Sequence, residues 1–300
     1  MYQIKHHTSS NSIEITHSKK RVYGLIHLNQ GASLQELTLS GQDIIKNLEP
    51  LPYSQTYASS ILFPFANRIK DGAYTFRGNN YNFNINHKEE HNALHGLVFN
   101  KTFKIIDQKA DTSSASVILE YNEDQHSQGF PYTFSIQLTY TFTANTLRLS
   151  IAVNNTDSKP FPFTIGWHPY FASDNLYDST VHFKSDEKID IGDRNITNGI
   201  EAIEPINTFQ IKDQKLDDCW ILKGHDIHFK TPQYQFTIAS SVAPNFLQLF
   251  TPPKANIIAI EPTTGVSDSF NNKIGLQTLK PKDIYEVTWD LKMKTTNNGL

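Results

Sequence analysis

The 300-residue sequence contains a single cysteine, little charge, and no apolar run long enough to cross a bilayer. One cysteine, Cys219, excludes an internal disulfide and agrees with a reducing compartment. Nothing close to it in sequence would activate it as a nucleophile. The N-terminal residues MYQIKHHTSS lack the basic start and apolar core of a secretory signal. We therefore expect a soluble, cytoplasmic protein with no membrane partner.

Charged residues make up 19% of the chain, and the formal net charge is -3. This balance offers no electrostatic attraction to a polyanion, so we expect no nucleic-acid partner. The sequence also lacks a G-x-S-x-G elbow, a phosphate-cradling glycine loop and a CxxC pair. These absences leave serine acyl transfer, nucleotide binding and ribbon-type zinc sites without support. No linker or repeat divides the chain, so we expect one domain over residues 1–300.

Period-two alternation of apolar residues is the strongest structural signal. It runs from Tyr132 to Phe142 and from Leu147 to Val153, with the turn TANT between, and predicts a long antiparallel hairpin. A second hairpin is expected around RGNN, with strands near residues 74–76 and 81–85. Further strands are expected at GLIHL, SVILEY, STVHFK, DIHFK, YQFTIAS, FLQLF, IIAIE and residues 285–291.

Long helical periodicity is absent, and the segment 174–218 has the weakest strand pattern. We expect long loops in that segment. The many strands with short connections predict an all-β fold, either two large antiparallel sheets packed face to face or a closed barrel.

Two segments could carry binding groups. Arg68 follows the apolar run ILFPF, and is either a solvated surface arginine or a guanidinium that holds two hydroxyls or an anion. His87, His91 and His95 are four residues apart, which on a helix would suit zinc. The asparagines and the glycine in HKEEHNALHG disfavour such a helix, so we expect no metal site. His95 is the best placed of the three to meet a ligand.

Two further segments could carry proton transfer. His168 lies in FPFTIGWHPYF and is either a packed core residue or an acid that donates a proton and takes it back. Its aromatic neighbours could support the apolar face of a sugar ring. Glu261 ends the apolar run IIAIE, where a carboxylate is either paired structurally or poised as a base. Asp217 and Asp218 in LDDCW could supply a second carboxyl for glycoside hydrolysis.

Several segments in a fixed order resemble the aldose 1-epimerase family, the galactose mutarotase-like proteins, from about Gly24 to Leu291. They are NRIKDGAYTFRGNNYNFNIN, LHG, PYTFSIQLTYTF, LRLSIAVNN, FPFTIGWHPYF, LDDCW, IAIEPTTG and LKPKDIYEVTWDL. Each segment is short, and their order carries the resemblance.

The resemblance implies a single antiparallel β-supersandwich domain that interconverts the α and β anomers of a free aldose, such as an aldohexose, without a cofactor or metal. It implies Glu261 as the general base and His168 as the general acid. Arg68 and His95 would bind sugar hydroxyls, and Asp217, with Asp218 as second choice, would hold another hydroxyl. We expect a monomer or a homodimer.

Alternatives remain within and beyond this family. The context GWHPYF resembles bacterial aldose epimerase-like proteins more than the best-known galactose enzymes, which leaves the sugar open. A related branch acts on hexose 6-phosphates and would need cations such as Arg77, Lys70 and Arg194. A carbohydrate-binding protein without turnover, a glycan-cleaving enzyme using Glu261 and Asp217, and a zinc enzyme are the other candidates.

Overall fold

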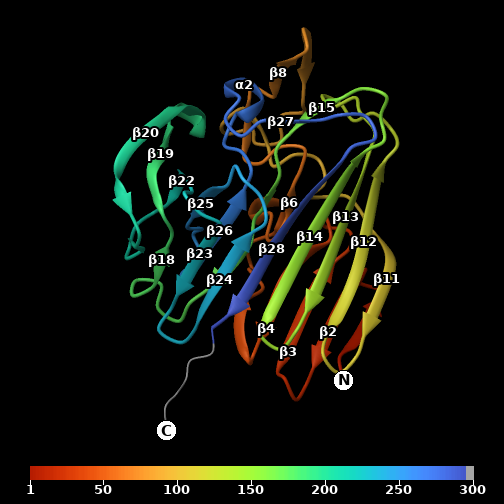
Figure 1. Ribbon diagram of the computed structural model, residues 1–300, viewed down its shortest axis with the longest axis vertical. Coiled ribbons are helices and arrows are strands. Elements are labelled where there is room, and N and C mark those ends of the chain that lie inside the picture. Colours follow the sequence, from red (N-terminus) through yellow and green to blue (C-terminus); the bar gives the residue numbers. More distant parts are fainter. Residues whose placement is uncertain (295–300) are drawn as a thin grey trace.

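The computed structural model describes residues 1–294, and the polar end of the chain at residues 295–300 lies outside the described residues. Antiparallel strands make up nearly all of the regular structure (Figure 1). They form three large sheets and three two-stranded ones. The strand orders of the large sheets have free ends, so the sheets are open and the closed-barrel alternative is wrong.

The five-stranded sheet is a simple meander of the N-terminal residues. It contains β1 (Gln3–His7), β2 (Ser12–His17), β3 (Val22–His27), β4 (Ser33–Leu39) and β5 (Gln42–Ile45), in that order.

The nine-stranded sheet contains the long predicted hairpin. Its order is β11 (Lys104–Ala110), β12 (Ala115–Glu123), β13 (Phe134–Phe142), β14 (Thr146–Asn155), β28 (Ile284–Met293), β24 (Gln235–Ser240), β23 (Asp226–Lys230), β18 (Thr180–His182) and β21 (Phe209–Gln210). The hairpin of β13 and β14 is confirmed, and β13 alternates between buried and half-buried side chains along its length.

The eight-stranded sheet carries the side chains discussed below. Its order is β20 (Thr197–Ile206), β19 (Ser185–Ile191), β22 (Asp217–Ile221), β25 (Phe246–Phe250), β26 (Ile257–Thr263), β16 (Gly166–Trp167) and β6 (Ile61–Leu62), and β17 (Tyr170–Ala172) also pairs with β26.

The remaining elements are short. They are the pairs β7 (Arg68–Lys70) with β10 (Asn92–Leu94), β8 (Ala73–Phe76) with β9 (Asn79–Asn82) and β15 (Phe161–Phe163) with β27 (Gln277–Leu279), the helices α1 (Tyr53–Thr56) and α2 (Ser269–Asn272), and the 3-10 turn η1 (Asp193–Asn195). The pair β8 and β9 confirms the second predicted hairpin, although its second strand covers residues 79–82 and not the predicted 81–85. No helix among residues 1–294 is long and apolar enough to cross a membrane.

One face of the nine-stranded sheet is covered by both of the other large sheets. Tyr140 in β13 donates a hydrogen bond to the carbonyl of Ala32, beside the five-stranded sheet, at 3.0 Å. Trp289 lies in the same cross-strand row as Tyr140, and its ring stacks on Trp167 of the eight-stranded sheet with centroids 6.4 Å apart. Paired residues on neighbouring strands share a face, so the two covering sheets lie side by side. This arrangement confirms the expected β-supersandwich.

The expectation of long loops over residues 174–218 is wrong. This segment contains β18, β19, η1, β20 and β21 and begins β22, and β19 and β20 form a long hairpin at the end of the eight-stranded sheet (Figure 1). Most side chains of β20 are exposed or half-buried. Only Ser185 and Ile189 of β19 and Thr197 of β20 are buried, so the hairpin has little buried side to impose apolar alternation and left no clear periodic signal.

The close approach of two sheets predicts the effect of one substitution. Gly24 in β3 faces Phe142 in β13, and a Cβ atom at Gly24 would lie 2.6 Å from Cε1 of the ring. We expect Gly24→Ala to lower the free energy of unfolding by about 1–3 kcal/mol because it overpacks the core. Chemical denaturation measures this loss. Gly199→Ala in β20 is the matched control, since nothing lies within 4 Å of its added Cβ. Equal stabilities of the two variants would contradict the packing described here.

Candidate active site

A cavity of about 600 Å³ opens beside the eight-stranded sheet. The five predicted site residues all line it: Arg68, His95, His168, Asp217 and Glu261. Its lining comprises Ser54, Gln55, Thr56, Tyr57, Asn67, Arg68, Asn86, His87, Lys88, Glu89, Leu94, His95, His168, Tyr170, Asp217, Gln248, Phe250 and Glu261. These residues come from segments far apart in the chain. The fold therefore brings the five predicted side chains into one recess.

The strand register sets His168 opposite Glu261. On one side, Tyr170 of β17 pairs with Ala259 of β26, and on the other, Gly166 of β16 pairs with Thr263. Both pairs have the same register, and in this register His168 lies directly across from Glu261. Such neighbours share a face of the sheet with their Cβ atoms about 5 Å apart.

Two prolines interrupt the pairing where β26 faces the break between β16 and β17. Pro169 follows His168, and Pro262 follows Glu261 within β26. A proline has no N–H to give to a strand ladder, so regular pairing cannot continue here. The main chain of His168 bonds instead to the segment before β6, donating to Ser60 at 3.0 Å and accepting from Ser59 at 2.8 Å.

His168 and Glu261 are deeply buried and close together. Nε2 of His168 lies 3.5 Å from Oε1 of Glu261, and their exposed fractions are 5% and 3%. The imidazole stacks on Tyr170 at 4.9 Å between ring centroids and meets the His95 ring edge to face at 5.0 Å. Nδ1 of His168 has no hydrogen-bond partner among the described residues. Both groups are thus held in fixed positions at the base of the cavity.

Burial shifts the pKa values of this pair in opposite directions. Desolvation raises the pKa of Glu261 well above its usual value, the nearby Asp217 adds to the rise, and Arg68 opposes it. Desolvation also lowers the pKa of His168 to about 4. Both shifts favour the neutral form of each group. A carboxyl and an imidazole in this state can exchange one proton through a bound molecule without leaving an isolated buried charge.

Gln248 extends the same row of side chains, and the sequence interpretation missed it. It pairs with Glu261 across β25 and β26, and its Nε2 donates to Oδ1 of Asp217 at 2.7 Å. A polar residue within the apolar strand FLQLF was a signal that could have identified it. Gln248 therefore lies between Glu261 and the carboxylate of Asp217.

Asp217 and Asp218 lie on opposite faces of β22, as alternation along a strand requires. Asp217 lines the cavity, whereas Asp218 forms an ion pair with Lys188 at 2.5 Å. Burial raises the pKa of Asp217, and the positive charge of Arg68 opposes this rise. Only the first of the two aspartates can therefore meet a molecule in the cavity.

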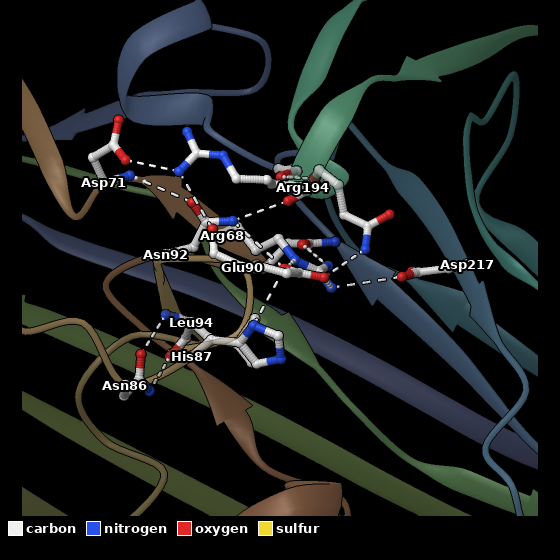
Figure 2. A network of polar contacts seen from close by, with 12 residues as sticks. Arg68, Asp71, Asn86, His87, Glu90, Asn92, Leu94, Arg194 and Asp217 are labelled. Atoms are coloured by element: carbon white, nitrogen blue, oxygen red, sulfur yellow. Dashed lines mark hydrogen bonds and ion pairs between the residues drawn. The ribbon is translucent and has the colours of Figure 1, made fainter.

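Arg68 presents its guanidinium to the cavity from the start of β7. Its Nε and Nη2 donate to the two carboxylate oxygens of Glu90 at 2.5 and 3.0 Å, and Nη1 donates to Asn67 at 2.9 Å (Figure 2). Nη2 also lies 3.6 Å from Asp217. Arg68 is thus a half-buried group with fixed orientation, and the reading as a solvated surface arginine is wrong.

His95 follows β10 in a left-handed backbone conformation, with a φ of 63°. Gly96 also has a left-handed backbone conformation, and a Cβ atom there would lie 2.2 Å from the carbonyl oxygen of Phe63. Only glycine fits that close approach. The turn directs the His95 ring into the cavity, where Tyr57 meets it edge to face at 4.8 Å. Desolvation lowers the pKa of His95 well below its ordinary value, so the ring is neutral.

The three histidines considered for zinc are not arranged on a helix. His91 is exposed and pairs with Asp71 at 3.0 Å, His87 borders the cavity, and His95 lies inside it. No group of three histidine, cysteine or acidic side chains in residues 1–294 is arranged to hold a metal ion.

Comparison with known proteins identifies related sequences. The model of the aldose 1-epimerase family matches residues 12–292. Uncharacterized protein YihR of Escherichia coli is 30% identical over 141 residues, 47% of this chain and 44% of YihR. Galactose mutarotase of Mus musculus is 26% identical over 160 residues, 52% of this chain and 45% of the mouse protein. The matches span less than half the length of these curated relatives.

Solved structures share the fold over nearly the whole chain. A galactose mutarotase-like protein from Clostridium acetobutylicum has a TM-score of 0.86 at 20% identity, covering 99% of both chains. Galactose 1-epimerase from Lactobacillus acidophilus has a TM-score of 0.79 at 17% identity, covering 98% of both. At these identities the likeness establishes the fold, which is galactose mutarotase-like.

Burial of His168 predicts its titration. We expect its imidazole to stay neutral from pH 7 down to about pH 5 and to gain a proton near pH 4, because the charged ring loses its hydration. Side-chain NMR of histidine-labelled protein, assigned with a His168→Gln variant, measures this. The unfolded chain, with an ordinary histidine pKa of about 6.5, gains its proton first. His168 therefore lowers stability as the pH falls from about 6.5 to 4. A midpoint at or above 6.5 in the folded protein would contradict the assignment.

Proposed function

Because this chain belongs to the aldose 1-epimerase family, we propose that it is a mutarotase that interconverts the α and β anomers of a free aldose. Glu261 is the proposed general base and His168 the general acid. One observation carries the proposal: the two groups are cross-strand neighbours 3.5 Å apart at the base of the cavity. We further propose that residues 1–300 act as one catalytic domain.

The proposed reaction opens and closes the sugar ring. Glu261 takes the proton of the C1 hydroxyl as His168 gives a proton to the ring oxygen. The bond between C1 and the ring oxygen breaks, and C1 becomes an aldehyde. Rotation about C1–C2 presents the other face of the aldehyde, and the two groups then act in reverse. The protons held by the pair are the same before and after the cycle.

The opposing pKa shifts support this exchange. Burial leaves both groups neutral in the resting site, with the proton on Glu261. Before Glu261 can act as the base, that proton moves to His168, which lies 3.5 Å away, and the resulting opposite charges attract each other. Neither step leaves one buried charge alone. The pair returns to its starting protonation state after each interconversion, so it can serve both directions of the reaction.

The rest of the lining suits a monosaccharide. A volume of about 600 Å³ is within the usual range for small-ligand sites. Tyr170 and Phe250 supply apolar surface, and Arg68, His95 and Asp217 supply polar groups that we propose bind sugar hydroxyls. This mixture of aromatic and hydrogen-bonding groups supports an aldohexose as the partner.

A hexose 6-phosphate is the less favoured substrate. Lys70 and Arg194 line a separate recess of about 430 Å³, and the Arg77 guanidinium lies over the Phe76 ring. The three candidate phosphate-binding cations are therefore outside the lining of the main cavity. This supports a free aldose.

Loss of either proton-transfer group is expected to abolish most turnover. His168→Ala and Glu261→Ala should each lower kcat by at least about a hundredfold, because each removes general acid–base help. Polarimetry of freshly dissolved α-galactose and α-glucose measures the rate. His91→Ala is a matched control on the exposed loop and should retain the wild-type rate. Equilibration by the wild type no faster than in buffer, for every aldose tried, would end the proposal.

Three further measurements separate the alternative functions: sugar affinity, release of reducing ends and the effect of a chelator. In a binding protein without turnover, sugar binds, Glu261→Gln leaves the affinity unchanged, and no rate enhancement is seen. A glycan-cleaving enzyme would release new reducing ends from oligosaccharides, and a zinc enzyme would lose activity with a chelator.

Arg68 is expected to act mainly on affinity. Arg68→Ala should raise KM for the preferred aldose by at least about tenfold, because a hydrogen-bonding charged group is lost from the binding surface. kcat should fall much less, since the proton-transfer pair lies on the sheet. Initial rates over a range of sugar concentrations separate the two, and thermal unfolding checks that the variant is folded. A fall in kcat with unchanged KM would assign Arg68 to the chemical step.

A further inference from the structure

Glu90 is the carboxylate nearest to Arg68, yet it contacts the arginine from outside the cavity lining. We propose that Glu90 cancels the charge of Arg68 and so makes the site select neutral sugars against sugar acids and sugar phosphates. It is a positioning residue, because it acts through Arg68 and does not touch the sugar. The inference rests on the proposed function, since it concerns the same sugar site.

The contact between the two side chains is a bidentate one. Both oxygens of Glu90 accept hydrogen bonds from Arg68, at 2.5 Å from Nε and 3.0 Å from Nη2. The paired, parallel geometry gives such a contact strength and a fixed orientation. Both side chains are mostly buried, with exposed fractions of 12% for Arg68 and 18% for Glu90, so solvent screens the pair only partly.

Other groups hold Glu90 in its charged form. Nδ2 of Asn195 donates to Oε1 of Glu90 at 2.7 Å, and Nδ1 of His87 lies 3.4 Å from Oε2. Burial works against the charge of Glu90, but the hydrogen bonds and charge of Arg68 and the Asn195 bond outweigh it, so the pKa of Glu90 is lowered. At neutral pH this carboxylate therefore faces the guanidinium permanently.

These contacts leave Arg68 few free donors. A guanidinium has five N–H groups. Glu90 takes the Nε donor and one on Nη2, and Asn67 takes one on Nη1. One N–H remains on each terminal nitrogen, and Nη2 is also 3.6 Å from the carboxylate of Asp217. Glu90 thus occupies the bidentate edge formed by Nε and Nη2 and closes it to a phosphate or carboxylate, whereas the two remaining N–H groups can still donate to hydroxyls.

The local charge balance favours the same selection. The positive charge of Arg68 lies between the carboxylate of Glu90 and that of Asp217. An anionic ligand would therefore approach an arginine whose positive charge Glu90 already compensates, with the carboxyl group of Asp217 beside it. Like charges brought together in this way reject a wrong partner.

The hairpin of β19 and β20 keeps Glu90 in position. Its turn at η1 supplies Asn195, and Nδ2 of Asn92 donates to the carbonyl of Arg194 at 2.9 Å. The Arg194 side chain in turn donates to Asp71 at 2.8 Å (Figure 2). The exposed hairpin thereby fixes the loop that presents Glu90 to the arginine.

The test compares matched pairs of sugars in the full-length protein. Galactose with galacturonate, and glucose with glucuronate, differ only in a CH₂OH or a carboxylate at C6. We expect wild type to bind each neutral sugar more tightly than its acid. Glu90→Gln should lower the ratio of acid to neutral dissociation constants by at least about tenfold, because it removes the compensating charge but keeps the shape. Ligand-observed NMR titration at low ionic strength measures both constants.

Three further variants sharpen this result. Glu204→Gln removes an equal charge from an exposed position of β20 that is outside the cavity lining, and it should change the ratio less than about twofold. Glu90→Asp keeps the charge and should keep the preference for neutral sugars. Glu90→Ala also removes the charge, and it replaces Glu90→Gln if thermal unfolding shows that Glu90→Gln does not fold.

The outcomes separate this inference from the proposed function. An unchanged ratio in the Glu90 variants, with neutral sugars still bound, would overturn the role of Glu90 alone. An equal change in Glu204→Gln would do the same, because general electrostatics would then explain it. Failure of the wild type to bind any of the four sugars would overturn both proposals. A shifted ratio in a protein that does not speed mutarotation would uphold the role of Glu90 and leave a sugar-binding protein.

Discussion

The register that sets β16 and β17 against β26 is the constraint on which the site depends. Because both short strands keep the same alignment with β26, His168 faces Glu261 across the break between them. A slip of one residue would turn one of these side chains toward the opposite, core-facing side of the sheet. The neighbouring pair of Gln248 with Glu261 follows from the ladder of β25 and β26. Three polar groups thus form a row because three stretches of backbone are aligned.

This row has a cost in free energy, since burial disfavours the charged form of each ionisable group in it. The large shared core between the three sheets can carry that cost. The shifts of His168 and Glu261 away from their charged forms are the visible consequence. The two shifts place the resting proton on Glu261, and in the proposed reaction that proton passes to His168 before the ring opens. The same burial that weakens the fold locally therefore also sets which of the two groups holds the proton.

The sequence predicted those parts of the molecule whose pattern is local. The hairpin of β13 and β14 has one buried face, so alternation revealed it, whereas the solvated hairpin of β19 and β20 gave no such signal. The site residues were found through resemblance to a family, but their convergence depends on pairing between distant strands. Neither Glu90 nor its neighbour Glu89 stands out in the loop sequence. Only the fold shows that one of them meets Arg68.

The side chains of the cavity form two groups that are held in place in different ways. The row of His168, Glu261 and Gln248 belongs to the eight-stranded sheet, and its geometry is fixed by backbone hydrogen bonds that no single side chain controls. The groups around Arg68 are held by side-chain contacts from the loop before β10 and from the hairpin of β19 and β20. Loops tolerate substitution better than paired strands do. Under the proposed function, changes in that second group would alter which sugar is accepted while the chemistry on the sheet stays the same, so the choice of substrate and the chemical step would be structurally separable in this fold.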